Sequence, residues 1–279
     1  MKIAIIGLGL IGGSMAIDLK KRNFCNHIIG VDTNKLHAET SKRLGLVDEI
    51  LDIEKAIKES EIIILATPAD ATLRMIPKIL DQIENQIVTD VCSTKVNISD
   101  RIKFHQNRKN YVSAHPMAGT EYSGPWAAIS GLFDGKAVIF TDAEDSDEKA
   151  LFKIRNLYDT LNMRPLYMSA NNHDAHVAYV SHISHISSFA LALTVLEKEK
   201  NEKNIFNLAS GGFDSTVRLA KSSAEMWTPI FMQNNDNVIT VLDTYIDKLQ
   251  QFKAAIEEND NDKMNNLITK ANKIKKVLS

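Results

Sequence analysis

The chain has 279 residues, of which 44% are hydrophobic and 24% are charged, an ordinary globular composition that excludes disordered, collagen-like and low-complexity proteins. Its 33 Lys and Arg against 35 Asp and Glu leave a net charge of −2, so the sequence offers no basic surface to nucleic acid. The length favours two domains, which we place at residues 1–168 and 169–279.

The sequence predicts a cytoplasmic protein with no membrane partner. Cys25 and Cys92 cannot form a disulfide framework, which fits a reducing compartment. The apolar run Ile3–Ile11 is interrupted by glycines and is not followed by a signal-peptide cleavage site. We expect no stretch to reach the roughly 18 apolar residues that cross a bilayer.

Short apolar runs alternate with helical patterns through the first domain. The predicted strands are Lys2–Ile6, His27–Val31, Ile62–Ala66, Ile87–Asp90, Tyr111–Ala114, Ala137–Thr141 and Arg164–Tyr167. The predicted helices are Gly12–Lys21, Asn34–Leu44, Ala71–Gln82, Lys95–Phe104 and Ser146–Leu161. This alternation requires parallel strands joined by crossovers, so the fold class is an α/β doubly wound (Rossmann-type) parallel sheet.

The strand signals stop after Met168, and the second domain is predicted to be all-helical. Apolar residues recur at helical spacing from Ala170 to Leu278. The polar stretches Asn201–Asn204 and Glu257–Asp262 are expected to connect helices. Long apolar helix faces need a partner, and we predict a homodimer that forms through this domain.

A dinucleotide site is predicted where the first strand ends. Gly7, Gly9 and Gly12 form the pattern Gly-x-Gly-x-x-Gly, which allows a tight turn, close approach of a pyrophosphate and close packing of helix on strand. Leu10 and Ile11 lie inside this turn, where the positive end of the helix favours the pyrophosphate. A glycine-rich turn without a ligand is the alternative.

The predicted cofactor is NAD. Asp32 ends the second strand, where a carboxylate can accept hydrogen bonds from both adenosine ribose hydroxyls and repels the extra phosphate of NADP. Thr67 and Pro68 end the third strand at the carboxyl edge of the sheet and are expected to line the cofactor site, although Pro68 could equally be a loop terminator.

A general base is predicted at the end of the fifth strand. Pro116 disfavours a helical conformation at His115, which keeps His115 extended and directed into the cleft. A neutral imidazole there can accept the proton of a substrate hydroxyl. The alternative is a buried histidine with a satisfied hydrogen bond.

Polar residues on the first predicted helices of the second domain indicate a small-molecule pocket. Regular helical spacing aligns Asp174, Ser181 and His185 on one face. His182 and His185 could chelate zinc, but no cysteine or spaced carboxylate completes the ligands, so no metal is predicted. Arg218 can clamp a carboxylate through two hydrogen bonds, and a surface salt bridge is its alternative role.

Taken together, these motifs resemble the prephenate dehydrogenase family, which includes cyclohexadienyl and arogenate dehydrogenases. The resemblance covers essentially the whole chain. It depends on GLGLIGGS at Gly7–Ser14, DVCSTK at Asp90–Lys95, HPMAGTE at His115–Glu121, HDAHVAYVSHISH at His173–His185 and the block Gly211–Trp227. It implies NAD-dependent oxidative decarboxylation of prephenate to 4-hydroxyphenylpyruvate, on the route to tyrosine.

The resemblance also implies roles for individual residues. His115 matches the catalytic histidine that accepts a hydrogen bond or proton from the substrate hydroxyl, and Ser93 matches the serine that orients it. Arg218 matches the arginine that binds a substrate carboxylate. Further pocket residues are Ser181, His185, Glu121, Thr120 and Trp227.

One departure from the family concerns the support of Arg218. Relatives often carry an acid three residues before the arginine, where this chain has Ser215, and the nearest acid is Asp214. The sequence therefore leaves the partner of Arg218 undetermined.

Three alternative functions remain open. The first is an arogenate dehydrogenase, although a histidine at 185 that can be cationic suits the pyruvyl group of prephenate better than the ammonium of arogenate. The second is another NAD(P)-dependent small-acid reductase of similar architecture. The third is a catalytically silent NAD-binding sensor, which has no physical need for Ser93, His115, His185 and Arg218 together.

Overall fold

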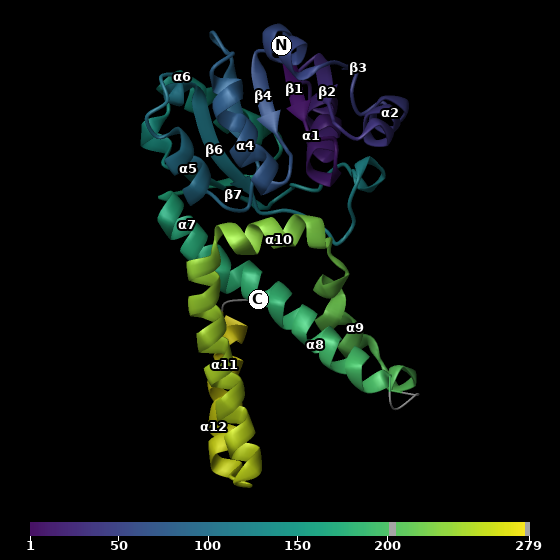
Figure 1. Cartoon of the computed structure of the whole chain (residues 1–279), viewed down its shortest axis with the longest axis vertical. Helices are drawn as coiled ribbons and strands as arrows, with labels where there is room; N and C mark the ends of the chain where they lie inside the picture. The colour runs from purple at the N-terminus through teal and green to yellow at the C-terminus, as the bar shows by residue number, and fades with distance from the viewer. Residues whose placement is uncertain (201–204, 277–279) are drawn as a thin grey trace. The chain divides into compact units, whose positions relative to one another are not determined.

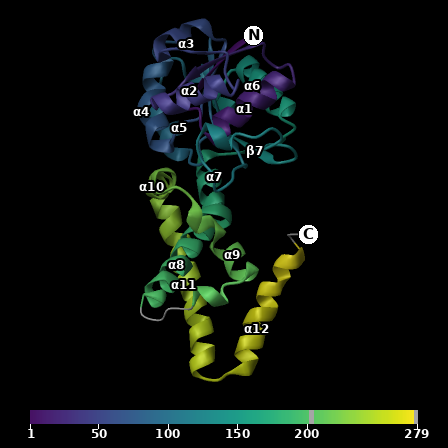
Figure 2. The same ribbon diagram turned by 90° about the vertical axis from the view of Figure 1, so that its right-hand side faces the viewer.

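The computed structural model describes residues 1–200 and 205–276. Residue contacts divide the chain into one compact unit, Met1–Asn234, and a second unit that begins at Asn235. The first unit contains the sheet and the helices up to α10, and Figures 1 and 2 show it from two sides. The predicted connection Asn201–Asn204 lies outside the described residues.

Eight strands form one sheet in the order β3-β2-β1-β4-β5-β6-β7-β8. The strands are β1 Lys2–Ile6, β2 His27–Val31, β3 Glu49–Ile50, β4 Ile62–Leu65, β5 Ile87–Asp90, β6 Tyr111–Pro116, β7 Ala137–Thr141 and β8 Arg164–Met168. The helices between them are α1 Leu10–Lys21, α2 Lys35–Arg43, α3 Ile53–Glu59, α4 Ala69–Leu80, α5 Val96–Ile102 and α6 Glu148–Thr160. The predicted strands and helices are therefore present, and β3 and α3 were not predicted.

Helices cover both faces of the sheet, as the isoleucine-rich strands require. One core joins the sheet to α1 and α6 through residues such as Met15 and Leu157. The other joins it to α3, α4 and α5 through residues such as Ile57, Ile79 and Ile98. The first unit thus contains the doubly wound architecture that the sequence predicts.

The direction of the last two strands differs from an all-parallel sheet. β7 pairs antiparallel with β6, and β8 runs parallel to β7. The chain between Pro116 and Ala137 contains only a short 3-10 helix, Pro125–Ala127, so it makes no helical crossover. Instead this connection begins and ends at the carboxyl edge of the sheet and packs along α1, where Asp18 accepts hydrogen bonds from Ser130 Oγ and Gly131 N.

The helices that follow β8 are α7 Ala170–Val177, α8 Ile183–Glu199, α9 Gly211–Val217 and α10 Ala224–Gln233 in the first unit, and α11 Asn235–Glu257 and α12 Asn261–Ala271 in the second. A π-helical turn, Ala178–His182, joins α7 to α8. The expected connection at Glu257–Asp262 is confirmed, since α11 ends and α12 begins there.

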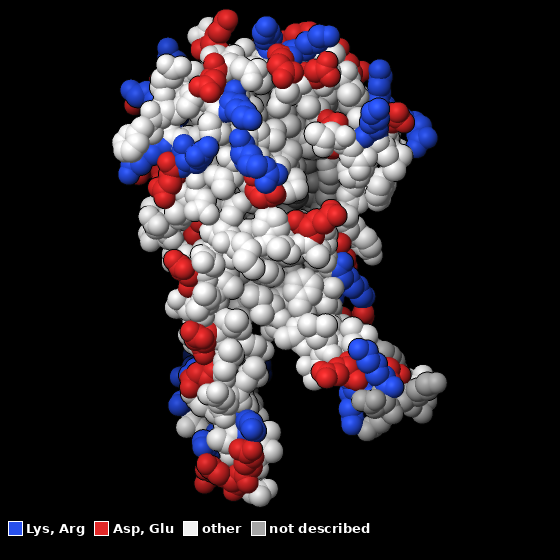
Figure 3. Space-filling view, in the orientation of Figure 1, with Lys and Arg blue, Asp and Glu red and all other residues white. Residues whose placement is uncertain are grey.

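The expectation that no segment could cross a bilayer is wrong by length and composition. The π turn makes α7 and α8 continuous, so Ala170–Glu199 forms one helical segment of 30 residues, which contains an 18-residue window apolar enough to cross a membrane. Side chains on it that include Tyr179, Val180, Leu193 and Leu196 are exposed. In Figure 3 the face over α10 and the part of α8 near it carries few charges, whereas the far end of α8 and the surface over the sheet carry charges of both signs.

Candidate active site

The turn between β1 and α1 depends on its glycines. Gly7 has φ +99°, and a Cβ there would lie 2.4 Å from the carbonyl oxygen of Ala66. A Cβ on Gly12 would lie 2.1 Å from the oxygen of Gly7, so strand and helix pack without room for a side chain. Gly9 is different, because nothing lies within 4 Å of the position that its Cβ would take. The turn is therefore closely packed at Gly7 and Gly12 and has open space beside Gly9.

Donors suited to an anion face this open space. Gly13 N donates the first hydrogen bond within the helix, to the oxygen of Gly9, so the N–H groups of Leu10, Ile11 and Gly12 have no acceptor within α1. The N-cap is a glycine and the first turn contains no acid that would compete. These residues fit the pyrophosphate of a dinucleotide, as the sequence predicts.

Asp32 lies beside this turn and is held in place by the backbone. Its two carboxylate oxygens accept hydrogen bonds from Leu8 N at 2.9 Å and Asn34 N at 2.8 Å. Each oxygen keeps a lone pair, so the carboxylate can still accept from ribose hydroxyls. Thr67 lies at the same edge, with its hydroxyl 2.8 Å from that of Thr72, and Pro68 is the exposed N-cap of α4.

His115 is the second-last residue of β6, before Pro116, and is 9% exposed. Its Nδ1 lies 2.8 Å from Nε2 of His173, a residue of α7. Burial lowers the pKa of His115 well below 6.5, and His173 and Lys95 lower it further. The ring is therefore neutral near pH 7, which is the state that a general base needs.

A fully buried ion pair lies beneath His115. Lys95 Nζ is 2.7 Å from Asp90 Oδ2, and both side chains have no exposed surface. Lys95 Nζ also donates to the oxygen of Ala114, the residue before His115. Asp90 accepts a 2.6 Å hydrogen bond from the hydroxyl of Tyr111. Ser93 lies between the two partners of this ion pair in the loop that joins β5 to α5.

The predicted face of Asp174, Ser181 and His185 includes the π-helical turn, where the backbone departs from regular α-helical spacing. Asp174 is buried, whereas Ser181 and His185 are half-buried. His182 takes the buried position, where Nδ1 lies 3.2 Å from Nδ2 of Asn234. The same Asn234 amide donates to the oxygen of Asp174.

His185 stacks on Trp227, with ring centroids 3.5 Å apart and planes inclined by 28°. His182 contacts the edge of the same tryptophan. Burial lowers the pKa of His185, and Arg218 lowers it further. The neutral ring is therefore favoured, which differs from the cationic histidine on which the expected preference for a pyruvyl group depends.

Glu121 is the partner of Arg218. Arg218 Nη1 lies 3.3 Å from Glu121 Oε2, and half of the arginine side chain is exposed. Asp214 pairs with Lys221 at 2.9 Å instead. Thr120, next to Glu121, accepts a hydrogen bond from Tyr122 N. The acidic partner of Arg218, which the sequence lacks at Ser215, is thus Glu121 in the loop after β6.

Sequence reasoning assigned no role to His173 and Lys95, placed Asp174 only on a polar helix face, and considered His182 only as a rejected zinc ligand. Four residues, His173, Asp174, Lys95 and His182, were therefore not predicted as partners in the site. All four are buried, and all lie within or next to the motifs that carry the family resemblance. Buried ionisable residues in such motifs are the signal that could have identified them. Among the described residues, no group of three or more His, Cys, Asp and Glu side chains is placed to hold a metal.

The β1–α1 turn fits a dinucleotide, and a neutral histidine lies at the same carboxyl edge of the sheet. This combination defines a nicotinamide-dependent dehydrogenase. Family models narrow the class: "prephenate dehydrogenase, nucleotide-binding domain" matches residues 15–167, and "prephenate dehydrogenase, dimerization domain" matches residues 169–270. The chain belongs to the prephenate dehydrogenase family.

Individual relatives agree. The chain is 32% identical over 262 residues to prephenate dehydrogenase of Bacillus subtilis, which covers 92% of this chain and 71% of that protein. Prephenate dehydrogenase of Aquifex aeolicus, solved with hydroxyphenyl propionate and NAD+, superposes with a TM-score of 0.87 at 26% identity and covers 100% of this chain and 98% of its own. Arogenate dehydrogenase of Synechocystis has a TM-score of 0.78 at 29% identity, with 100% of each chain covered. These matches confirm the predicted family, fold class and enzyme class.

Proposed function

We propose that the protein catalyses the NAD-dependent oxidative decarboxylation of prephenate to 4-hydroxyphenylpyruvate, CO2 and NADH, the activity that the resemblance implies in tyrosine biosynthesis. The observation that carries the proposal is a neutral, buried His115 at the carboxyl edge of a nucleotide-binding sheet, in a chain of the prephenate dehydrogenase family. His115 and Ser93 are the proposed catalytic residues.

The cofactor residues follow from the turn. The N–H groups of Leu10, Ile11 and Gly12 hold the pyrophosphate, and Asp32 holds the adenosine ribose and disfavours NADP. Gly7, Gly9, Thr67 and Pro68 shape the surrounding wall. NAD, when bound, accepts the hydride.

The side chains of the protein accept the proton and orient the substrate. Oxidation removes a hydride from the ring carbon that bears the hydroxyl and a proton from that hydroxyl, and His115 takes the proton. Loss of the ring carboxylate as CO2 leaves its bonding electron pair in the ring, which becomes aromatic, and the resulting phenolate oxygen takes the proton back from His115. Since aromatisation supplies the driving force, the protein mainly has to orient the substrate and accept the proton.

We assign the substrate contacts to residues around Trp227. Arg218 binds a carboxylate, and Glu121 holds the arginine in position until substrate enters. The face of Trp227 and its stacked partner His185 fit a flat six-membered ring. Ser181 and Thr120 complete the proposed pocket.

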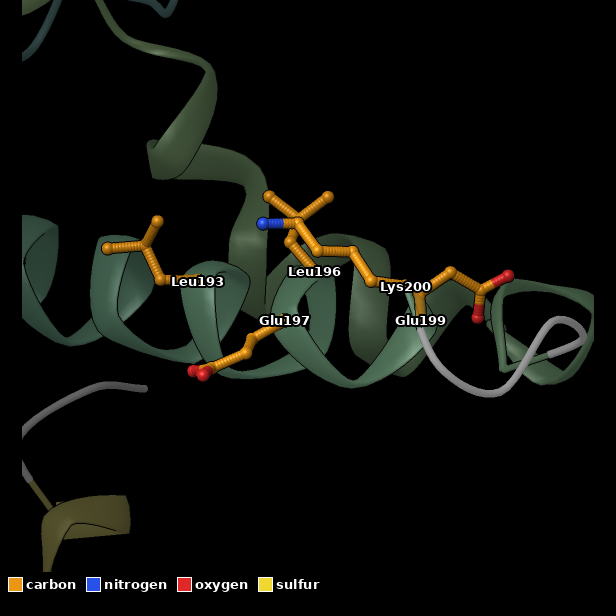
Figure 4. Close-up of a pocket in the computed structure, with 5 residues that line it drawn as sticks. All are labelled: Leu193, Leu196, Glu197, Glu199 and Lys200. Atoms are coloured by element: carbon orange, nitrogen blue, oxygen red, sulfur yellow. The ribbon is translucent and has the colours of Figure 1, made fainter.

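We further propose that the protein is a cytoplasmic homodimer formed through a helical domain at residues 169–279, with residues 1–168 as the NAD-binding domain. The family description of residues 169–270 as a dimerization domain supports this division. The apolar side chains of α8 that include Leu193 and Leu196 then face a second subunit rather than lipid. Figure 4 shows both leucines next to Glu197 and Lys200.

A second candidate substrate is arogenate, because the lowered pKa of His185 leaves a neutral ring that can accept a hydrogen bond from an ammonium group. NADH formation by the purified protein, measured with each substrate under NAD and NADP, separates the two. Turnover with prephenate and NAD is the expected result. Turnover with arogenate alone would reassign the substrate, and silence in all four assays would refute the proposed activity.

A further inference from the structure

A chain of three buried groups leads from His115 into the first helical turns after β8. His115 Nδ1 lies 2.8 Å from His173 Nε2, and His173 Nδ1 lies 2.7 Å from Asp174 Oδ1. His115, His173 and Asp174 are 9%, 0% and 1% exposed. The two imidazole rings meet nearly edge to face, at an interplanar angle of 71°. Water therefore does not compete for these contacts.

Asp174 is fixed as an acceptor by the chain that it touches. Its carboxylate accepts hydrogen bonds from Lys95 N at 2.9 Å and from Val96 N at 2.9 Å, at the start of α5. Backbone N–H groups can only donate, so both carboxylate oxygens face donors. The position next to His173 is consequently an acceptor as well.

This acceptor determines where the protons of both rings lie. Facing a carboxylate, His173 Nδ1 carries its proton and donates it to Asp174. In the neutral ring, His173 Nε2 is then without a proton and accepts from His115 Nδ1. With its proton on Nδ1, neutral His115 has its free lone pair on Nε2. The opposite arrangement would place the lone pair of His173 Nδ1 against the carboxylate, which is repulsive.

We propose that His173 and Asp174 are positioning residues that hold His115 in the tautomer with a free lone pair on Nε2, and so make it a base for the substrate hydroxyl. The proposal deepens the proposed function and rests on it for the identity of the base. It also gives the family's dimerization segment a direct part in catalysis, since both residues come from α7.

Asp174→Asn is the decisive variant. The Oδ2 position is within reach of both backbone donors, Val96 N at 2.9 Å and Lys95 N at 3.1 Å, so we expect the amide oxygen there and the NH2 at the Oδ1 position, which faces His173 Nδ1. That reverses each tautomer and leaves a proton on His115 Nε2. We expect kcat to fall by about 10²- to 10⁴-fold, the range of general base catalysis, with KM for prephenate and Kd for NAD nearly unchanged.

Nitrogen NMR of the histidine rings above pH 7 tests the tautomer directly. The chain has eight histidines, and comparison with His115→Asn assigns the His115 signals. The expected wild-type pattern is a protonated Nδ1 and a bare Nε2, which exchange in Asp174→Asn. The same bare Nε2 before and after the substitution would overturn the proposal, whether or not the protein oxidises prephenate. Silence of the wild type towards prephenate, by contrast, would refute only the proposed activity.

Two further variants separate positioning from folding. In His173→Gln the amide oxygen can accept from His115 Nδ1 while the NH2 donates to Asp174, so most of the activity should return relative to His173→Leu. Asp142→Asn is the matched control, because Asp142 accepts from Ala170 N of the same helix at 2.9 Å without touching either ring. It should leave kcat within about twofold of the wild-type value. Equal losses in His173→Gln and His173→Leu, or a loss in Asp142→Asn as large as that in Asp174→Asn, would indicate a structural role and overturn the proposal.

Discussion

Replacing Lys95 by Met removes one partner of the fully buried ion pair with Asp90 and leaves the other in place. Nζ of Lys95 has two acceptors, Asp90 Oδ2 and the oxygen of Ala114, and neither can reach water. Breaking a buried pair in this way costs about 3–5 kcal/mol, because the remaining charge is uncompensated. Asp90 keeps the hydrogen bonds from Tyr111 and Cys92, which places the expected loss near the lower limit, about 3 kcal/mol.

Urea unfolding measures this loss as a fall in the transition midpoint at an unchanged m-value. In thermal unfolding the same loss lowers Tm by on the order of 10 °C for a chain of this size. Lys42→Met, on the exposed surface of α2, is the matched control and should stay within about 0.5 kcal/mol of the wild type.

A double-mutant cycle with Asp90→Asn isolates the interaction between the two groups. The double variant contains neither charge of this pair, so its loss in stability should be smaller than the sum of the two single losses by about 1–3 kcal/mol. Additive losses, or a Lys95→Met variant as stable as Lys42→Met, would refute the view that the pair is a desolvated unit.

The remaining predictions concern the active site. His115→Asn should lower kcat by about 10²-fold or more with NAD affinity retained, and an unchanged kcat in steady-state assays would remove His115 from its role as base. Arg218→Ala should mainly raise KM for prephenate, whereas a loss confined to kcat would contradict the carboxylate assignment. Asp32→Ser should relax discrimination against NADP, measured as the ratio of kcat/KM for the two cofactors. Because the base works unprotonated and burial lowers the pKa of His115, activity should be lost on acidification only below pH 6.5, and a pH profile with its limb above that value would argue against this base.

Sequence patterns predicted the strands well because six of the eight lie inside the sheet. Side chains on both faces of such a strand are buried, so the strand is an unbroken apolar run in the sequence. Ile62–Leu65, for example, is buried at every position. The elements that were not predicted are short: β3 contains only Glu49 and Ile50, which pair with Ile29 and Gly30. Two residues cannot establish a period, so this strand exists only because β2 offers it a partner.

Strand direction also lies outside what local patterns specify. Ala137–Thr141 has the same apolar character whether it runs parallel or antiparallel to β6. The connection before it decides, because without a crossover helix the chain can only turn back along the carboxyl edge. That return brings Thr120 and Glu121 to the active-site edge, which is why Glu121 meets an arginine 97 positions later in the chain.

The candidate site was predictable in its residues but not in its contacts. The motifs named His115, Arg218 and His185, whereas the partner of His115 lies 58 positions away and depends on how α7 docks. The π-helical turn is a further reason, since local patterns gave no sign of it between Asp174 and His185. Local periodicity describes elements, and the fold decides which of their polar groups meet.

The basicity of His115 results from two opposed effects that the same burial creates. Removing water disfavours the charged imidazolium, which keeps the base free near pH 7 but weakens its attraction for the substrate proton. The Asp174 carboxylate opposes this, because it accepts the proton of His173 Nδ1 and so leaves His173 Nε2 as the acceptor for the Nδ1–H of His115, a hydrogen bond that becomes stronger when His115 is charged. His115 can thus be unprotonated before the reaction, and its protonated form is stabilised as it takes the substrate proton. No water molecule is needed at either step.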